Sequence, residues 1–371
     1  MATKSPLVVQ ELLNRCIDFL ALSRYYTRDF VSCSLVARSW VDASQANLFR
    51  APSFLDLDDD TVNAIPAFYR ALTTNPALAR YVRELTLPPS LPHDLSKINF
   101  TRLERLSITV KYSVSDGLGR LLSLPTLRYV SITTTTVPFS HFINAWSLCS
   151  PTIQHLELWC QKGVGDAPLS EVDTGRTVLI PLKSFSLDYT CDLDFDLTLP
   201  QSVFFPFDFS TVKALAVVVH EEIPWSLIPR SEVESLVIYS PVSADAAPDL
   251  DLSSFPKLTN LRIDCHDFIL SNILEILSTI SASQRVHTIS LVFGEDLDSY
   301  PELCDALDTV LSSLPTTPLP CVELEVDDCT EELKDSFTKL ISKNMLRVVP
   351  YFENEDEAEG DLWWRRIIDR L

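Results

Sequence analysis

The sequence lacks the segments that mark membrane and secreted proteins. Its 371 residues contain nothing close to the roughly eighteen unbroken apolar residues that a transmembrane helix needs. No signal peptide precedes Gln10, because Lys4 is the one basic residue before it and the apolar run is short. The nine cysteines are scattered and form no Cys-x-x-Cys pair, so neither a disulfide framework nor a zinc module is predicted. We therefore expect an intracellular protein, cytoplasmic or nuclear, that contacts no membrane.

The patterns of common enzyme and metal sites are missing as well. No nucleophile elbow, phosphate-binding loop or HExxH sequence is present. Aspartates cluster at residues 56–60 and 192–196, but no loop with EF-hand spacing follows either cluster. Cys265-His266-Asp267 has no second pair of ligands at metal spacing, so we interpret it as the end of a strand. We predict no catalytic residues, no metal and no cofactor, and only scattered Asp and His residues favour an enzyme.

Positive charge is scarce outside the first fifty residues. The chain carries 30 Lys and Arg against 51 Asp and Glu, which gives a net charge of −21. Residues 1–50 contain six of the basic and four of the acidic side chains, so residues 51–371 carry a net charge of −23. Such a body repels DNA, RNA and anionic membranes and attracts basic proteins. We expect no nucleic-acid partner, and a basic target protein is favoured.

Two amphipathic segments lie between residues 6 and 50. Apolar residues recur at steps of three and four in both, which predicts two helices with one apolar stripe each. A unit of about fifty residues buries only about 60% of its unfolded surface, so these helices need cover from the rest of the chain or from a partner. Capping of a larger domain and docking of a partner both remain open. The stripes consist of Val9, Leu12, Leu13, Cys16, Ile17 and Leu20, and of Phe30, Cys33, Ala37, Trp40, Val41 and Ser44.

Four short motifs give these helices a family resemblance. They are Glu11-Leu12-Leu13, Ile17-Asp18-Phe19-Leu20, Cys33-Ser34-Leu35-Val36-Ala37-Arg38-Ser39-Trp40 and Leu48-Phe49-Arg50. The string resembles the F-box, a helical module that docks on the Skp-family adaptor of cullin ubiquitin ligases. One departure is Val8-Val9-Gln10, where the family usually has Leu-Pro before the first Glu-Leu. The resemblance implies that the adaptor is bound by Val9, Glu11, Leu12, Leu13, Ile17, Leu20, Leu35, Val36 and Trp40.

From Val82 onward one phrase recurs about every 26 residues, within the range of leucine-rich repeats. It consists of an apolar residue, two variable residues, an apolar residue, one variable residue and an apolar residue. In the order of the chain the phrases are Val82/Leu85/Leu87, Leu103/Leu106/Ile108, Leu127/Val130/Ile132, Ile153/Leu156/Leu158, Leu182/Phe185/Leu187, Val212/Leu215/Val217, Val233/Leu236/Ile238, Leu258/Leu261/Ile263, Val286/Ile289/Leu291, Cys321/Leu324/Val326 and Leu346/Val349/Tyr351.

Each phrase predicts a short strand, because its last two apolar residues lie two apart and share one face. Stacking such strands in parallel buries a face that one repeat cannot bury alone. The body thus resembles a leucine-rich-repeat solenoid of a degenerate kind, in which only Cys329 supplies the Asn or Cys expected eight residues into the phrase. A doubly wound α/β domain is the second interpretation. Helical returns are predicted at residues 118–122, 142–146, 268–277, 303–311 and 333–341.

The residues that alternate with the buried ones predict a binding surface. Trp159 and Tyr239 are the expected anchors, since aromatic residues dominate interface hot spots, although Trp159 could equally pack on its neighbours. Carboxylates at residues 157, 188, 264, 323, 325 and 327 form an acidic rim that favours a basic ligand. Our candidate target-binding residues are Glu157, Trp159, Asp188, Tyr239, Arg262 and Asp264.

Together these patterns predict an α/β protein with three parts. Residues 1–50 form the F-box-like helical module, residues 51–352 the repeat solenoid, and residues 353–371 an acidic stretch with a capping helix that contains Trp363 and Trp364. The expected function is substrate recognition in an SCF-type cullin ubiquitin ligase, with the chemistry done by other subunits. The alternative is a non-catalytic leucine-rich-repeat scaffold or binding protein that does not bind the adaptor.

Overall fold

The computed structural model describes residues 38–54, 59–88, 95–111, 113–114, 116–134, 137, 139–160, 179–189, 206–218, 229–239, 250–265, 270–293, 301–326, 333 and 335–350. Within them the chain is α/β, and eleven parallel strands form its main sheet in the order of the sequence. The chain divides into two compact units, of which unit 1 is Met1–Ile153 with Val164–Thr177 and unit 2 is Gln154–Gly163 with Val178–Leu371. No helix among the described residues is long and apolar enough to cross a membrane.

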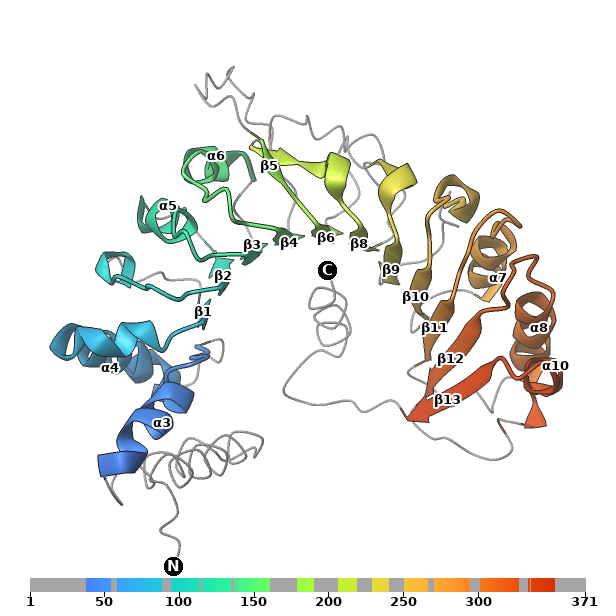
Figure 1. Ribbon diagram of the computed structural model, residues 1–371, viewed down its shortest axis with the longest axis horizontal. Helices are drawn as coiled ribbons and strands as arrows, with labels where there is room; N and C mark the ends of the chain where they lie inside the picture. Colours follow the sequence, from blue (N-terminus) through green and yellow to red (C-terminus); the bar gives the residue numbers. More distant parts are fainter. Residues whose placement is uncertain are drawn as a thin grey trace, which may run out of the picture. The chain divides into compact units, whose positions relative to one another are not determined.

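Three parallel strands form the sheet of unit 1. Their predicted apolar residues lie opposite one another, as in the row Leu85, Leu106 and Val130, and all three side chains are buried. Figure 1 shows α5 and α6 on one side of these strands, where Leu118 and Trp146 are buried. The elements are α3 (Arg38–Leu48), α4 (Asp59–Thr74), η1 (Pro76–Arg80), β1 (Glu84–Leu87), η2 (Leu95–Lys97), β2 (Arg105–Val110), α5 (Asp116–Leu122), β3 (Tyr129–Thr134), η3 (Phe139–Phe142) and α6 (Ile143–Trp146).

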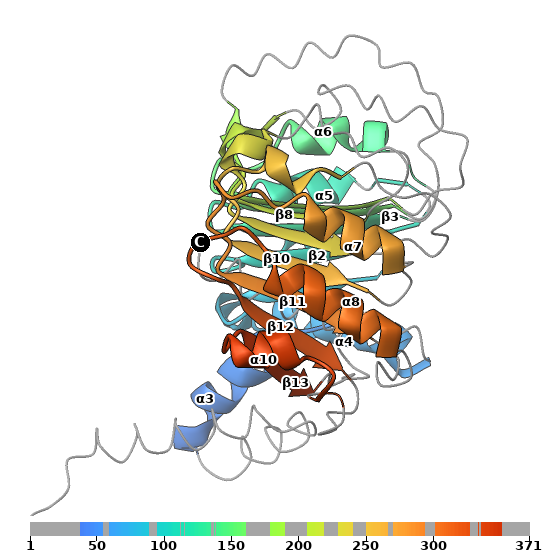
Figure 2. The same cartoon turned by 90° about the vertical axis from the view of Figure 1, so that its right-hand side faces the viewer.

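In the described part of unit 2, eight parallel strands form the main sheet. Between β6 and β10 the described returns contain short 3-10 turns and the two-residue strand β7, which pairs with β5. By contrast, α7, α8 and α10 lie side by side along strands β10 to β13 (Figures 1 and 2). The elements are β4 (His155–Cys160), β5 (Ile180–Pro181), β6 (Ser184–Tyr189), β7 (Phe207–Asp208), η5 (Phe209–Thr211), β8 (Ala214–Val218), η7 (Arg230–Glu232), β9 (Ser235–Tyr239), η8 (Leu252–Ser254), β10 (Asn260–Asp264), α7 (Leu270–Ser278), β11 (Thr288–Phe293), α8 (Pro301–Ser312), β12 (Cys321–Val326), α10 (Thr338–Ser342) and β13 (Leu346–Pro350).

The predicted phrases coincide with the main-sheet strands from β1 to β11, but their register is wrong in β12 and β13. Val322 and Leu324, not Leu324 and Val326, pair with Ile289 and Leu291 of β11. The phrase in β12 is therefore misplaced by two residues, and that in β13 by three, because Leu346 pairs with Val322. In β12 three apolar residues alternate, so the phrase fits in two registers and the sequence cannot choose between them.

One backbone pattern recurs at the start of the strands. A carbonyl group just before one strand accepts hydrogen bonds from two successive N–H groups at the start of the next strand. In unit 1, Glu104 O accepts from Arg128 N at 2.9 Å and from Tyr129 N at 3.0 Å. The recurrence means that the repeated sequence phrase corresponds to a repeated backbone arrangement. The acceptors are Arg50, Arg83 and Glu104 in unit 1 and Gln154, Lys183, Lys213, Glu234 and Thr259 in unit 2.

The segment after α3 takes part in this pattern. Arg50 O accepts from Arg83 N at 2.9 Å and from Glu84 N at 3.0 Å, and Ser53 forms a parallel bridge with Thr86 of β1. Phe68 of α4 packs on the rings of the same segment, with its centroid 5.3 Å from that of Phe54 and 6.0 Å from that of Phe49. Residues 50–54 thus occupy the place of a strand beside β1 and tie the end of α3 to the sheet of unit 1.

Threonine hydroxyls add a second recurring bond that the sequence interpretation missed. Thr126, Thr152 and Thr211 each donate to a backbone carbonyl 2.7–2.8 Å away. Each of them directly precedes the first apolar residue of its phrase, and the acceptor is the first apolar residue of the preceding phrase. Threonine at this position was visible in the sequence, and its side chain adds a hydrogen bond between consecutive repeats.

Replacement of Thr152 by valine tests the contribution of this bond. Valine keeps the shape of threonine, but the carbonyl of the buried Leu127 loses its hydroxyl donor. We expect the free energy of unfolding to fall by about 1 kcal/mol in urea titrations. Thr101→Val, at an exposed position of the same unit, is the matched control and should change stability by less than about 0.5 kcal/mol. Equal effects of the two substitutions would contradict a role for the hydroxyl bond.

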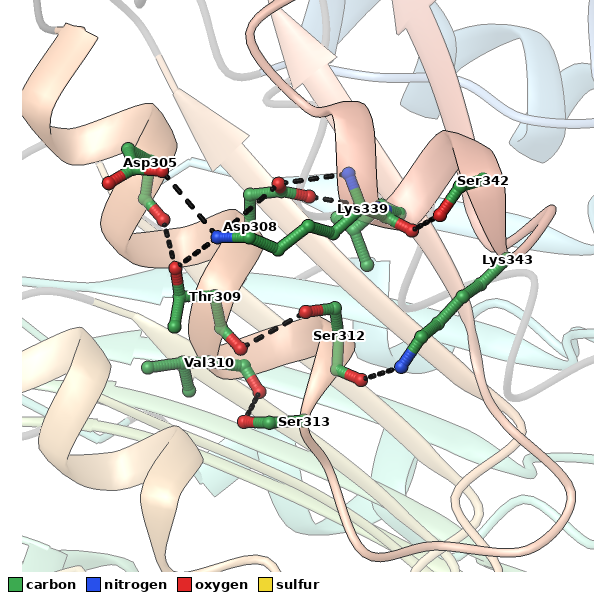
Figure 3. Close-up of polar contacts among 10 residues, drawn as sticks. Asp305, Asp308, Thr309, Val310, Ser312, Ser313, Lys339, Ser342 and Lys343 are labelled. Atoms are coloured by element: carbon green, nitrogen blue, oxygen red, sulfur yellow. Dashed lines mark hydrogen bonds and ion pairs between the residues drawn. The ribbon is translucent and has the colours of Figure 1, made fainter.

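Helix α10 receives its N-terminal cap from another helix. Asp308 of α8 is buried, and its carboxylate accepts from Lys339 N at 3.0 Å and from Leu340 N at 2.8 Å (Figure 3). The residue at the cap position of α10 itself, Phe337, makes no side-chain cap bond. The Lys339 ammonium group also reaches α8, where it donates to Thr309 Oγ1 at 2.6 Å. A carboxylate at a helix N-terminus satisfies free N–H groups and opposes the helix dipole, so Asp308 fixes α10 on α8.

Candidate functional site

The predicted adaptor-binding residues lie almost entirely outside the described part of the chain. Trp40 falls within α3, and its side chain is not described. Near it, Tyr81 donates its hydroxyl to Asp42 of α3 at 3.3 Å, and Arg80 stacks on the Tyr81 ring with its guanidinium carbon 4.7 Å from the centroid. The adaptor contact stays a prediction. The residues outside the description are Val9, Glu11, Leu12, Leu13, Ile17, Leu20, Leu35 and Val36.

The predicted target-binding residues all belong to unit 2, where they fall into two rows on the sheet face that alternates with the core. The first row contains one residue from each of the seven main-sheet strands β4, β6 and β8 to β12, and the second row lies two residues further along each strand. Strand pairing brings members of a row to neighbouring positions, for example Trp159 opposite Asp188. The first row is Glu157, Ser186, Ala216, Val237, Arg262, Ser290 and Glu323. The second row is Trp159, Asp188, Val218, Tyr239, Asp264, Val292 and Glu325.

The first row is closed to solvent along most of its length. The side chains from Ser186 to Ser290 are buried, and only the ends of the row at Glu157 and Glu323 are partly exposed. Arg262 is 3% exposed, so the prediction that it lies on an accessible surface is wrong. A target protein cannot reach its guanidinium group without displacing what buries it.

The charge of Arg262 is neutralised inside the protein. Its Nη1 forms an ion pair with Glu325 Oε1 and lies 3.3 Å from Ser290 Oγ. Ser290 in turn donates its hydroxyl to the same carboxylate oxygen at 2.7 Å. A buried charge without a partner is costly, whereas this arrangement supplies both an ion pair and a hydrogen bond. The contacts fix the orientation of the Glu325 carboxylate, whose side chain is 16% exposed.

The second row is more accessible than the first. Trp159 is 38% exposed, Tyr239, Asp264 and Glu325 are partly exposed, and Val292 is buried. Trp159, Tyr239 and Asp264 thus lie at accessible or partly accessible positions, while the side chain of Asp188 is not described. Their role in target binding stays a prediction. The register error in β12 had put Glu325 in the first row, in line with Arg262 and Ser290. Its true position is in the second row, in line with Asp264 and Val292.

The titratable groups of the described residues offer no arrangement typical of catalysis. Burial raises the pKa of the Cys265 thiol well above its usual value, and burial with the nearby Glu323 raises the pKa of Cys321. A raised pKa keeps these thiols protonated and weakly nucleophilic. His155 Nδ1 lies 2.8 Å from Ser184 Oγ, but both side chains are buried and the contact joins β4 to β6. Among the described residues no three His, Cys, Asp or Glu side chains gather closely enough to hold a metal ion.

Comparison with known proteins leaves the family open. No family model matches the chain, and no curated protein has a matching sequence. The resemblances to the F-box and to leucine-rich repeats therefore rest on the motifs of this sequence and on the strand pattern that accompanies them.

Proposed function

We propose that this chain is the substrate-recognition subunit of an SCF-type cullin ubiquitin ligase. Its N-terminal helices dock the Skp-family adaptor, and the second row of unit 2 binds the target protein. The observation that carries the proposal is the junction at Arg50. The F-box-like motifs end at this residue, and its carbonyl is the first acceptor of the pattern that recurs before the strands.

The body supports a leucine-rich-repeat solenoid as the fold of the recognition part. Parallel strands follow one another in chain order, and the predicted apolar residues occupy equivalent core positions from β1 to β11. A doubly wound α/β sheet changes direction in its strand order, whereas the described strands keep the order of the sequence. A repeat array presents a long open face suited to binding another protein.

The junction at Arg50 also bears on how firmly a bound adaptor would be held. Phe68 packs on Phe54, and Arg50 O is bonded to two N–H groups at the start of β1, so the chain after α3 is fixed to the first strand of unit 1. An adaptor that contacts α3, which contains Trp40, would therefore be held close to the start of the sheet of unit 1. Such a fixed arrangement suits a ligase subunit that must present its target to a separate catalytic subunit.

Co-purification with a Skp-family adaptor tests the proposal. We expect the intact chain to retain the adaptor, and Leu13→Ala or Trp40→Ala to reduce the retained fraction about tenfold, since buried apolar anchors dominate such interfaces. Trp159→Ala is the matched control, because it removes an aromatic side chain from unit 2. It should leave adaptor binding unchanged. Failure of the intact chain to bind any Skp-family adaptor would contradict the proposal.

The alternative function is a scaffold of the same fold without an adaptor. The observation in its favour is Val8-Val9-Gln10, which replaces the Leu-Pro that usually precedes the first Glu-Leu. In this case the stripe of Leu12, Ile17 and Leu20 would pack on residues 51–110 instead of on a partner. A chain that binds target proteins but no adaptor would identify this alternative.

A further inference from the structure

The second row combines aromatic, acidic and apolar positions in a way that the first row does not. Trp159 and Tyr239 are separated by three strand steps, and Asp264 and Glu325 by two. At about 4.8 Å per strand these separations are about 14 Å and about 10 Å. An extended peptide advances about 3.3 Å per residue, so about four and about three residues would cover them. The row therefore has the scale of a short peptide segment that crosses the strands.

Acidic side chains outnumber basic side chains in the two rows. Arg262 is the one basic residue within the two rows as defined, and Glu325 and Ser290 already satisfy its Nη1. Arg347 lies beyond the end of the first row and pairs with Glu323 at 2.8 Å. Asp264 and Glu325 are partly exposed at the second row, and the contacts of Glu325 with Arg262 and Ser290 both use its Oε1. The body as a whole has a net charge of −23. Charge complementarity selects a cationic partner for such a surface.

We infer that the second row docks a basic peptide segment of the target protein, and that Arg262 acts on this segment only by holding Glu325 in place. The inference rests on the proposed function, since it takes the bound protein to be the ligase target. Trp159 and Tyr239 offer ring faces on which guanidinium or aliphatic side chains stack. Asp264 and Glu325 receive the positive charges. Arg262 is a positioning residue, because its guanidinium group is buried and pairs with Glu325.

A labelled twelve-residue peptide of alternating arginine and leucine is a direct probe of this surface. In anisotropy titrations with the full chain we expect the double variant Asp264→Asn/Glu325→Gln to bind it about tenfold more weakly. Glu275→Gln/Glu302→Gln changes the net charge equally at exposed positions of α7 and α8, and it should leave the affinity unchanged. Equal losses in the two double variants would mean attraction to net charge alone and would overturn the inference. Trp159→Ala should also weaken binding, and an unchanged affinity would count against the row.

The role of Arg262 is separated by a double-mutant comparison. If Arg262 acts only through Glu325, then Arg262→Met/Glu325→Gln and Glu325→Gln should bind the arginine–leucine peptide equally well. A further loss in the double variant would mean that Arg262 itself contacts the segment, which would overturn its assignment as a positioning residue. Circular dichroism at the titration temperature confirms that each variant compared is folded.

The chain itself contains one basic segment that could compete for the row. Residues 361–371 carry Arg365, Arg366 and Arg370 beside Trp363 and Trp364. We expect deletion of these residues to leave the affinity for the probe unchanged. A marked rise in affinity after deletion, together with displacement of the probe by a synthetic 361–371 peptide, would assign the row to the chain's own segment and overturn the inference.

Adaptor co-purification of the same variants distinguishes the two proposals. If the chain binds the adaptor but the second-row variants keep full affinity for the probe, the docking surface is refuted and the ligase function stands. Loss of probe binding in those variants, with no adaptor bound by the intact chain, refutes the ligase function and leaves the docking surface in place.

Discussion

Arg262→Met is expected to lower the free energy of unfolding by about 3 kcal/mol. The substitution leaves the Glu325 carboxylate, 16% exposed, with Ser290 as its hydrogen-bond donor and without a counter-charge. Removal of one partner from a buried ion pair typically costs about 3–5 kcal/mol, because the remaining charge stays desolvated. Partial exposure of Glu325 places the expected value at the lower end of this range. Urea titrations followed by circular dichroism measure the change.

Two further variants decide whether the ion pair or the packing is responsible. Arg262→Met/Glu325→Met removes both charges, and we expect it to recover to within about 1 kcal/mol of the original chain. Arg347→Met breaks the pair with Glu323, in which the arginine side chain is 66% exposed. Exposed pairs contribute little, so this variant should lose less than about 1 kcal/mol. If the double variant is as unstable as Arg262→Met, the loss comes from packing and the explanation fails.

The strand positions could be predicted from the sequence because a phrase with two alternating apolar residues has one obvious strand register. This holds for Leu261 and Ile263 of β10, which are flanked by polar residues on the alternate positions. It fails in β12, where Val322, Leu324 and Val326 alternate over three positions and only pairing with β11 selects the register. The register decided which residue of β12 shares a row with Asp264, so the error moved Glu325 of the predicted acidic rim into the wrong row.

The burial of the first row could have been predicted from the sequence, although the alternation of apolar and variable residues did not indicate it. Ala214–Val218 contains no polar residue, and β9 is apolar at three consecutive positions, Leu236, Val237 and Ile238. Continuous apolar runs are typical of strands that are buried on both faces. The buried Arg262 gives no such signal, because its partner Glu325 is 63 residues away in the chain. An arginine at an alternate position is expected to be exposed until its counter-charge is located in space.

The N-terminal cap of α10 could not be predicted from the sequence either. We expect its removal to cause a large loss of stability. Asp308 precedes the N–H groups that it bonds by 31 and 32 residues, and within α8 alone it reads as an exposed helix residue. Asp308→Ala should lower the free energy of unfolding by about 2 kcal/mol, since the substitution leaves two helix N–H groups without their acceptor, and that of Leu340 is buried. Urea titrations of the full chain measure this loss.

Neighbouring substitutions separate the cap from the surface charges around it. Asp305, whose side chain is 83% exposed, lies 3.6 Å from the Lys339 ammonium group, and Asp305→Ala should cost less than about 0.5 kcal/mol. Asp308→Asn keeps a side-chain oxygen that can accept one of the two bonds, so its loss should lie between those of the two alanine variants. Hydrogen exchange at Leu340 and Ile341 gives a local readout. We expect faster exchange of these amides in Asp308→Ala than in Asp305→Ala. Unchanged exchange would mean that α10 stays docked through its apolar contacts, with Asp308 contributing little.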